Sequence, residues 1–423
     1  MDTILLQRSE WIRNQISNGI KNGVDRSSTL CKKKRKGTTA TSVWCEGNKK
    51  TQPKQATSLI SALPEELLVE ILSRLPPKPF FRCRSVCKYW LSLSSEAFGR
   101  NKHLQPTVCG LFHNYYYKGD SFAAFSYMSS GSNKVEGGDG IISALPCLNA
   151  MKVLDCCNGL VLLSALSRRQ PFMKVIYVYN PATQSLSALE PLSTLKNNDH
   201  FFPIFSLAFD SRAPSQLHLL CFTRFTKEDV MLDWFDIFSF EEGKCKRKHG
   251  KELAPDMIVN RYSKGTFLDG RVHRLTTQKK ILSIDPNNCS YEVIRLPDLE
   301  NLTLVEIGQS QGLLNCMTVC DNRILGIWVL KSYSRQEWTM KYQLSLHQIY
   351  SVPWLHLNVV DICRRIKYRD NFAFHPQKDV LFMPLGLSGL LIFDLSSSKR
   401  EELYNLGGFE LFGCWVYMPF YSI

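Results

Sequence analysis

The feature that most constrains the fold is a pattern of strands and turns that recurs through residues 108–423. Short stretches of alternating apolar residues are separated by Gly, Pro, Asn and Asp, and no long helical period interrupts them. A strand followed by a polar turn recurs around five anchor residues, which are Asn180, Ser239, Asp285, Lys331 and Asp394. Their spacing of 46 to 63 residues predicts β-propeller blades, since a hairpin-bearing unit repeated about every 40 to 50 residues is typical of that fold.

The length of this region predicts the number of blades. At about 50 residues per blade, residues 108–423 contain six, and a seventh is possible if one of the longer gaps hides a degenerate blade. The ring must also close, because an unpaired edge strand invites aggregation. We therefore expect a terminal strand at Cys414–Met418 to complete a blade that begins near residues 108–127. A two-sheet β-sandwich is the alternative, since the period does not fix how the hairpins stack.

A different pattern comes before the repeats, in the stretch LPEELLVEILSRLPP at residues 63–77. Pro64 and the two glutamates after it favour the first turn of a helix, and the Leu75-Pro76-Pro77 segment ends it. The apolar residues Leu67, Leu68, Ile71, Leu72 and Leu75 cover about 140° of the helix, whereas a one-sided surface helix needs about 100°. The helix is thus predicted to bury two different apolar surfaces.

Two short apolar segments follow this helix, at residues 80–86 and 87–93, and we expect both to be helical and to fold against it. A unit of this size is smaller than the roughly 40 residues below which a chain usually needs outside help to stay folded. Part of its apolar surface is therefore predicted to be covered by something else. A separate partner is favoured over the propeller, because the prolines at 76, 77 and 79 set the block apart.

The block from Leu63 to about Phe98 resembles the F-box, the helical module whose family binds the Skp-type adaptor of cullin–RING ubiquitin ligases. The resemblance rests on Leu63-Pro64, on the helix end at residues 71–76, and on Arg84-x-Val86-Cys87-Lys88-x-Trp90, which occur in the family's order and spacing. It implies an adaptor-contacting face made of Leu63, Pro64, Leu67, Ile71, Leu72, Leu75, Val86, Cys87 and Trp90. Pro79 replaces a residue that caps the second helix in many relatives, which is expected to shift the start of that helix.

The resemblance continues into the repeats. Asn158-Gly159-Leu160 and the later Asn180-Pro181-Ala182-Thr183 are similar to a motif pair of plant F-box proteins with an F-box-associated domain, which are kin of the kelch group. True kelch repeats place Tyr and Trp at set distances after a Gly-Gly pair. Gly137-Gly138 and Gly407-Gly408 lack that sequel, so the resemblance implies a kelch-like propeller only. The expected fold class is α+β and multidomain, a three-helix F-box followed by an all-β propeller.

The N-terminal tail is basic and polar. Residues 1–57 hold 12 Lys or Arg against 4 Asp or Glu, so +8 of the net charge of +14 falls there, and their composition predicts disorder. The run Lys32, Lys33, Lys34, Arg35 and Lys36 is a candidate nuclear-import signal. A folded nucleic-acid-binding protein would show a basic face on its body instead. The predicted domains are a tail at 1–57, an F-box at 58–104 and a propeller at 108–423.

No catalytic, metal-binding or cofactor motif was found in the sequence. The cysteines lack a second pair at zinc-ligand spacing, and His273 in an alternating strand is interpreted as a core residue. No secretory signal or membrane-spanning run is recognised. We therefore expect a non-enzymatic, soluble substrate receptor of an SCF-type ubiquitin ligase in the nucleus or cytoplasm, with a Skp-type adaptor, a cullin scaffold and an unknown protein substrate as partners. The alternatives are a nuclear nucleic-acid-binding protein that uses the tail, and a propeller enzyme with a central pocket.

Overall fold

The structure of the chain is a computed structural model. It describes residues 63–75, 77–84, 86–101, 108–117, 120–128, 135–137, 151–166, 174–189, 203–211, 213, 216–241, 244–298, 302–320, 323–350, 372–385, 389–403 and 410–420. The tail predicted at 1–57, with its basic run Lys32–Lys36, lies outside the described residues. The chain divides into two compact units, one containing residues 63–101 and the other containing the described residues after 107.

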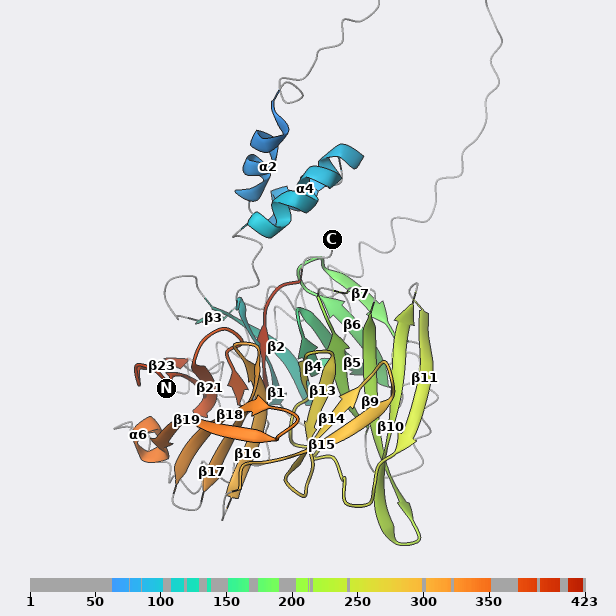
Figure 1. The fold of residues 1–423 in the computed structure, drawn as a ribbon, viewed down its shortest axis with the longest axis vertical. Coiled ribbons are helices and arrows are strands. Elements are labelled where there is room, and N and C mark those ends of the chain that lie inside the picture. Colours follow the sequence, from blue (N-terminus) through green and yellow to red (C-terminus); the bar gives the residue numbers. More distant parts are fainter. Residues whose placement is uncertain are drawn as a thin grey trace, which may run out of the picture. The chain divides into compact units, whose positions relative to one another are not determined.

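The described residues of the first unit form the helices α2 (Glu65–Ser73), α3 (Pro77–Arg84) and α4 (Lys88–Arg100), of which α2 and α4 are labelled in Figure 1. Pro64 precedes α2, and its carbonyl accepts the first helical hydrogen bonds, from the N–H groups of Leu67 and Leu68. Pro79 falls in the first turn of α3, where a missing N–H costs nothing. The core between the helices consists of Leu68, Val69, Leu72, Phe80, Leu93 and Ala97.

The side chain of Asn101 joins the last helix to the first. Its amide donates hydrogen bonds to the carbonyls of Leu72, at 3.1 Å, and Leu75, at 2.9 Å. These carbonyls lie at the end of α2 and just after it, and that of Leu72 also accepts the backbone N–H of Leu75 at 3.1 Å. One buried amide thus connects the residue after α4 with the end of α2.

Six four-stranded antiparallel sheets form the second unit, within the described residues. Blade 1 contains β24 (Glu410–Tyr417), β1 (Gly110–Tyr117), β2 (Asp120–Met128) and β3 (Val135–Gly137), and blade 2 contains β4 (Met151–Cys157), β5 (Leu160–Leu166), β6 (Lys174–Asn180) and β7 (Ser185–Ala188). Blade 3 contains β8 (Ile204–Phe209), β9 (Leu217–Lys227), β10 (Val230–Glu241) and β11 (Lys244–Glu252), and blade 4 contains β12 (Thr266–Leu268), β13 (Arg271–Leu275), β14 (Lys280–Asp285) and β15 (Ser290–Arg295). Blade 5 contains β16 (Leu302–Ser310), β17 (Leu313–Cys320), β18 (Ile324–Ser332) and β19 (Glu337–Ser345), followed by helix α6 (Leu346–Tyr350), and blade 6 contains β20 (Ala373–Phe374), β21 (Val380–Leu385), β22 (Gly389–Asp394) and β23 (Arg400–Leu403).

The first strands of the sheets contact one another in the closed order β4, β8, β12, β16, β20, β24 and back to β4, which is the inner ring of a propeller. The predicted six-bladed propeller is therefore confirmed, and the β-sandwich alternative is wrong. Every sequence anchor lies in the third strand of its blade, from β6 in blade 2 to β22 in blade 6. The anchors miss blade 1 because that blade is built from two distant parts of the chain.

Blade 1 closes the ring. Strand β24 pairs antiparallel with β1, from Gly110 opposite Tyr417 to Tyr116 opposite Glu410. The pairing agrees with the expected role of a terminal strand at 414–418, although the strand begins four residues earlier. It gives β1 an inner partner, so that blade 1 has four strands like the other described blades and its remaining inner edge lies within the ring.

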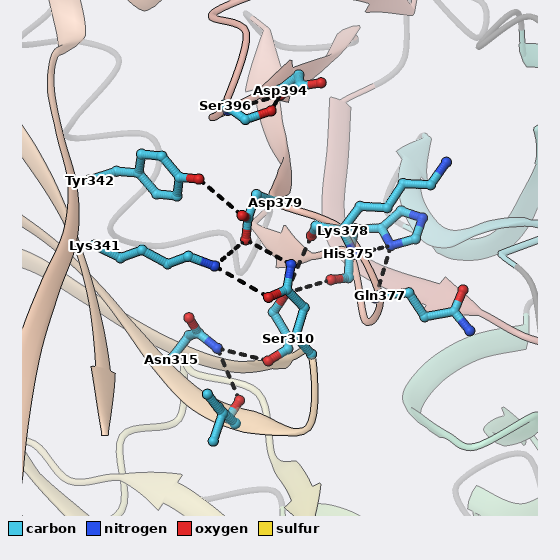
Figure 2. Close-up of polar contacts among 12 residues, drawn as sticks. Ser310, Asn315, Lys341, Tyr342, His375, Gln377, Lys378, Asp379, Asp394 and Ser396 are labelled. Carbon is cyan, nitrogen blue, oxygen red and sulfur yellow. Dashed lines mark hydrogen bonds and ion pairs between the residues drawn. The ribbon is translucent and has the colours of Figure 1, made fainter. Parts of the chain in front are cut away.

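Three of the sequence anchors act as turn-formers in the structure. Asn180, Asp285 and Asp394 are the last residues of β6, β14 and β22, and each accepts a hydrogen bond from the backbone N–H two residues later. A short side chain that bonds forward in this way forms an Asx turn, which starts the hairpin to the outer strand. Figure 2 shows the last of them, where Asp394 also accepts the Ser396 hydroxyl at 2.6 Å. The repeat recognised in the sequence thus includes an Asx turn that recurs at the end of the third strand in blades 2, 4 and 6.

Polar side chains fasten blade 5 to blade 6. Figure 2 shows Asp379, in the turn before β21, accepting hydrogen bonds from Lys341 Nζ at 2.6 Å and from the Tyr342 hydroxyl at 2.9 Å, both on β19. In the same turn, the carbonyl of His375 accepts the Ser310 hydroxyl at 2.9 Å. The turn between β20 and β21 is therefore held against the neighbouring blade at two points.

The two motifs of blade 2 hold the C-terminal segment that follows β24. Asn158 and Gly159 both have positive φ, at 45° and 89°, as in a tight hairpin turn, and a Cβ built on Gly159 would lie 2.4 Å from Phe420 Cβ. Asn180 donates its amide to the carbonyl of Phe420 at 3.1 Å. The ring of Phe420 packs on Phe209 with centroids 4.8 Å apart. Both motifs therefore serve the closure of the ring.

We predict that Gly159→Ala destabilises the propeller by about 2 kcal/mol or more, because the added methyl group meets backbone and Cβ atoms that cannot yield without moving residues 418–420. Gly270→Ala is the matched control. Gly270 also has positive φ, at 76°, but a Cβ there meets nothing within 4 Å, so only the conformational cost of about 1 kcal/mol is expected. Denaturant unfolding of both variants measures the difference, and equal losses would contradict the close approach.

Candidate functional site

An exposed apolar face lies on the helical unit. The large apolar side chains that solvent reaches are Leu63, Leu67, Ile71, Val86, Tyr89 and Leu91, and their exposed fractions run from 39% for Leu63 to 66% for Val86. Leu68, Val69 and Leu72 of the same helix are at most 4% exposed. Helix α2 therefore has two apolar faces, as its sequence predicts, and one of them has no cover within the described residues. We call the six exposed residues the helical apolar face.

The nine residues that the resemblance implied for adaptor contact differ in their exposure to solvent. Leu63, Pro64, Leu67, Ile71, Val86 and Cys87 are exposed, and Leu75 and Trp90 are half-buried. Leu72 differs, because it is 1% exposed and packs inside the helical unit, where it supports the face from below. Tyr89 and Leu91 of α4 are among the six exposed residues but were not among the nine. They are two positions apart on the helix and point to different sides of it, so helical spacing alone could not have grouped them.

A second candidate is a pocket on the outer side of blades 4 and 5, with a volume of about 540 Å³. It lies where β15 and the loop after it meet the turn between β18 and β19. Its lining includes Arg295, Asp298, Trp328, Arg335, Gln336 and Trp338. We call it the rim pocket. Nothing in the sequence alone pointed to it, because its two walls are contributed by different blades.

The third candidate is a buried group of charges at the inner ring, which we call the central charge cluster. It contains Asp155 on β4, Lys264 before β12, Arg274 on β13 and Glu306 on β16. Asp155, Arg274 and Glu306 are at most 6% exposed. These are the converging titratable groups that a propeller enzyme with a central pocket would require.

Every member of the central charge cluster has a structural partner. Asp155 accepts the backbone N–H groups of Cys156, at 2.9 Å, and of Leu207 on β8, at 2.8 Å. Lys264 Nζ donates to the carbonyl of Cys414 on β24 at 2.5 Å and to that of Phe372, just before β20. The cluster thus binds the inner strands of all six blades together.

The remaining two charges complete these connections. Glu306 accepts the hydroxyl of Ser263 at 3.1 Å, and Arg274 donates to Ser206 on β8 at 3.4 Å. Burial raises the pKa of Asp155 to about 6, although two backbone N–H groups and the charges of Arg274 and Lys264 oppose the rise. Burial likewise raises the pKa of Glu306, against the charge of Lys264. The geometry is that of a buried ionic connection between blades rather than of a substrate site.

The raised pKa of Glu306 has a consequence for stability. The folded chain retains a proton on Glu306 that the unfolded chain releases near its ordinary pKa of 4.5. The resulting contribution to the free energy of unfolding is complete below pH 4.5 and is lost as the pH rises through neutrality.

We predict that the free energy of unfolding of the wild type, minus that of Glu306→Gln, falls by about 2 kcal/mol between pH 5 and pH 8. The variant removes the titration and keeps an oxygen that accepts from Ser263. Denaturant titrations at the two pH values provide the measurement. Glu292→Gln on β15, where the side chain is 70% exposed, controls for the loss of a negative charge. A difference between wild type and variant that stays constant with pH would show that Glu306 does not titrate in this way.

His273 is fully buried, its Nδ1 lies 3.3 Å from the carbonyl of Thr266, and burial lowers its pKa to about 4, so it lies in the core as predicted. Among the described residues, no group of three His, Cys, Asp or Glu side chains is placed to hold a metal ion. None of the described helices has the length and apolar character needed to cross a membrane.

Comparisons with known proteins agree with this arrangement. The family profile described as F-box-like matches residues 60–101, which include the helical unit. From Arabidopsis thaliana, F-box protein At5g07610 is 24% identical over 307 residues, which cover 67% of this chain and 71% of the relative. F-box protein At5g49610 is 24% identical over 376 residues, covering 83% and 94%, and putative F-box/kelch-repeat protein At1g15680 is 25% identical over 380 residues, covering 81% and 86%.

Residues 60–101 are therefore an F-box-like domain, and a six-bladed β-propeller follows it in this chain. The Arabidopsis F-box proteins are homologues at 24 to 25% identity. That the propeller is kelch-like stays a prediction. A chain of a solved mitotic checkpoint complex matches with a TM-score of 0.32 and 13% identity, over 59% of this chain and 64% of that chain, and so weak a likeness carries no argument.

Proposed function

We propose that the protein is the substrate receptor of an SCF-type ubiquitin ligase, with the F-box-like domain binding a Skp-type adaptor and the propeller binding a protein substrate. The observation that carries the proposal is the helical apolar face. Solvent-exposed apolar side chains scattered singly are ordinary, but six on one small helical unit mark an interaction surface. Full burial of one such side chain contributes about 1.5 to 3 kcal/mol, so a few of them account for tight adaptor binding.

The inner and outer faces of α2 have separate roles in this proposal. Leu68, Val69 and Leu72 keep the helix in place, whereas Leu67 and Ile71 on its other face contact the adaptor. The exposed ion pair between Arg74 and Glu70, at 2.5 Å, lies at the polar margin of that helix. An apolar centre with a polar rim is the usual anatomy of a protein interface.

Ubiquitin transfer in this proposal needs no catalytic group from the chain. The ligase subunits would hold a ubiquitin-charged enzyme, and the propeller would raise the local concentration of substrate lysines beside it. Marking for proteasomal degradation is the proposed outcome. The cullin scaffold and the substrate are part of the proposal, as are the domain limits 1–57, 58–104 and 108–423.

The basic run Lys32–Lys36 bears on where the protein works, and we propose that it acts as a nuclear-import signal. The alternative function, nucleic-acid binding by the tail, remains a prediction. It is distinguished by its salt dependence, because such binding weakens steeply as salt rises and is abolished when residues 1–57 are removed. Adaptor binding through an apolar face depends far less on salt.

We predict that Leu67→Glu and Ile71→Glu each weaken adaptor binding at least tenfold, because a charge in the centre of an apolar interface is left without a partner. Their effect on stability is expected to be small, since both side chains are about half exposed. Co-purification of the full chain with a Skp-type adaptor measures the binding, and replacing Leu63 and Pro64 by alanine tests the edge of the same face.

Leu68→Ala is the control on the opposite face of the helix. Because Leu68 is buried, we expect a loss of about 2 to 5 kcal/mol in stability of the helical unit. If the folded Leu67→Glu and Ile71→Glu variants co-purify with the adaptor as well as the wild type does, the helical apolar face is not the adaptor-binding surface. The proposal would then lose the observation that carries it.

A further inference from the structure

The rim pocket has walls that are fixed before anything binds. The side-chain amide of Gln336 donates to the carbonyl of Val293 at 3.1 Å, and its oxygen accepts the backbone N–H of Arg295 at 3.1 Å. Trp338 Nε1 donates to the carbonyl of Arg295 at 2.8 Å. These bonds connect the edge of β15 in blade 4 with the turn before β19 in blade 5. The pocket is thus a preformed feature that two blades share.

Two indole rings line this preformed pocket. Trp328 Nε1 donates to the hydroxyl of Thr318 at 3.1 Å, and the Trp338 N–H is used as described above. Gly326 makes room for the first ring, since a Cβ at that position would lie 2.9 Å from Trp328 Nε1. With both N–H groups satisfied, the half-buried rings offer apolar and aromatic surface rather than hydrogen-bond donors.

The charges around the rings are mostly positive. Arg295 and Arg335 are exposed at the pocket, and neither guanidinium forms an ion pair with a described residue. Asp298 is the acidic residue of the lining. Guanidinium groups bind carboxylates with two parallel hydrogen bonds, and Trp and Arg are among the residues enriched at the binding hot spots of protein interfaces.

We propose that the rim pocket binds a segment of a partner protein in which an aromatic side chain is flanked by aspartate or glutamate. The aromatic side chain packs on the indole rings of Trp328 and Trp338, and the flanking carboxylates pair with Arg295 and Arg335. That this segment belongs to the ubiquitination substrate rests on the function proposed above, whereas the binding itself does not.

Single-stranded nucleic acid also stacks on aromatic rings beside arginine, but the surroundings of the pocket disfavour it. Glu292 on β15 and Glu337 on β19 are exposed on the same two strands, and Asp298 lies in the pocket. A phosphate backbone needs a continuous positive track, and these carboxylates interrupt it. A peptide carries its negative charge at separate side chains and so avoids them.

The test begins with a phage-displayed library of random peptides, selected on the immobilised full chain. We expect the wild type to enrich sequences in which Asp or Glu flanks Phe, Tyr or Trp. A fluorescein-labelled synthetic copy of the most enriched peptide is then titrated by fluorescence anisotropy. Reversing both charges, in Arg295→Glu with Arg335→Glu, should weaken its binding at least tenfold, and Trp338→Ala should do the same. Circular dichroism and thermal unfolding confirm that each variant is folded.

The matched control is Arg323→Glu with Lys399→Glu, which makes the same change in net charge at exposed positions outside the pocket and should bind like the wild type. The inference is overturned if the wild type enriches no sequences in which Asp or Glu flanks an aromatic residue. It is also overturned if the Arg295→Glu, Arg335→Glu variant binds the peptide as tightly as the control variant does. It is also overturned if a single-stranded oligonucleotide binds the wild type, loses that binding in the Arg295→Glu, Arg335→Glu variant, and is not displaced by the peptide.

The same preparations separate this inference from the proposed function. Leu67→Glu should retain peptide binding while losing the adaptor, and the rim-pocket variant should retain the adaptor while losing the peptide. Adaptor binding without peptide binding overturns the rim pocket alone. Peptide binding without adaptor binding supports the pocket and counts against the ligase.

Discussion

The antiparallel pairing of β24 with β1 is the constraint on which the rest of the propeller depends. It joins the two ends of the β-region into one sheet, so that the inner strands form a closed ring. The central charge cluster becomes possible only inside that ring, because Lys264 reaches carbonyls of β24 and of the segment before β20. Charges of both signs at this depth are tolerated since each has a partner, and removing one partner would leave the other buried and uncompensated.

The two units of the chain use apolar surface in opposite ways. The propeller buries its apolar residues between blades, where clusters such as that of Met317, Ile349 and Phe374 exclude solvent. The F-box-like domain buries one face of α2 and leaves the other uncovered within the described residues. A small unit cannot enclose both faces of such a helix. This limit explains how the F-box-like domain can be folded and still present an apolar surface for binding.

The sequence predicted those parts of the structure that arise locally. Asn180, Asp285 and Asp394 marked the blades because each forms an Asx turn with its own neighbours, and the period of their turns is visible in one dimension. The closure by the last strand followed from the need to pair an edge. Two arrangements were not predicted: Asp155 and Glu306 both interact with the charges of Lys264 and Arg274, and Trp338 donates a hydrogen bond to the carbonyl of Arg295. Each joins different blades, and no local pattern encodes it. Leu72 was included in the contact face by the family resemblance, and its burial depends on how the three helices pack, which no local pattern encodes.

Ring closure by β24 also orders events during synthesis. The helices of the F-box-like domain are complete once translation has passed residue 101, whereas blade 1 lacks its inner strand until translation has reached Tyr417. At typical elongation rates the interval lasts roughly tens of seconds. Throughout that time β1 has an open edge on the nascent chain. Pairing with β24 therefore also ends the period in which the edge of β1 is a template for pairing with another chain.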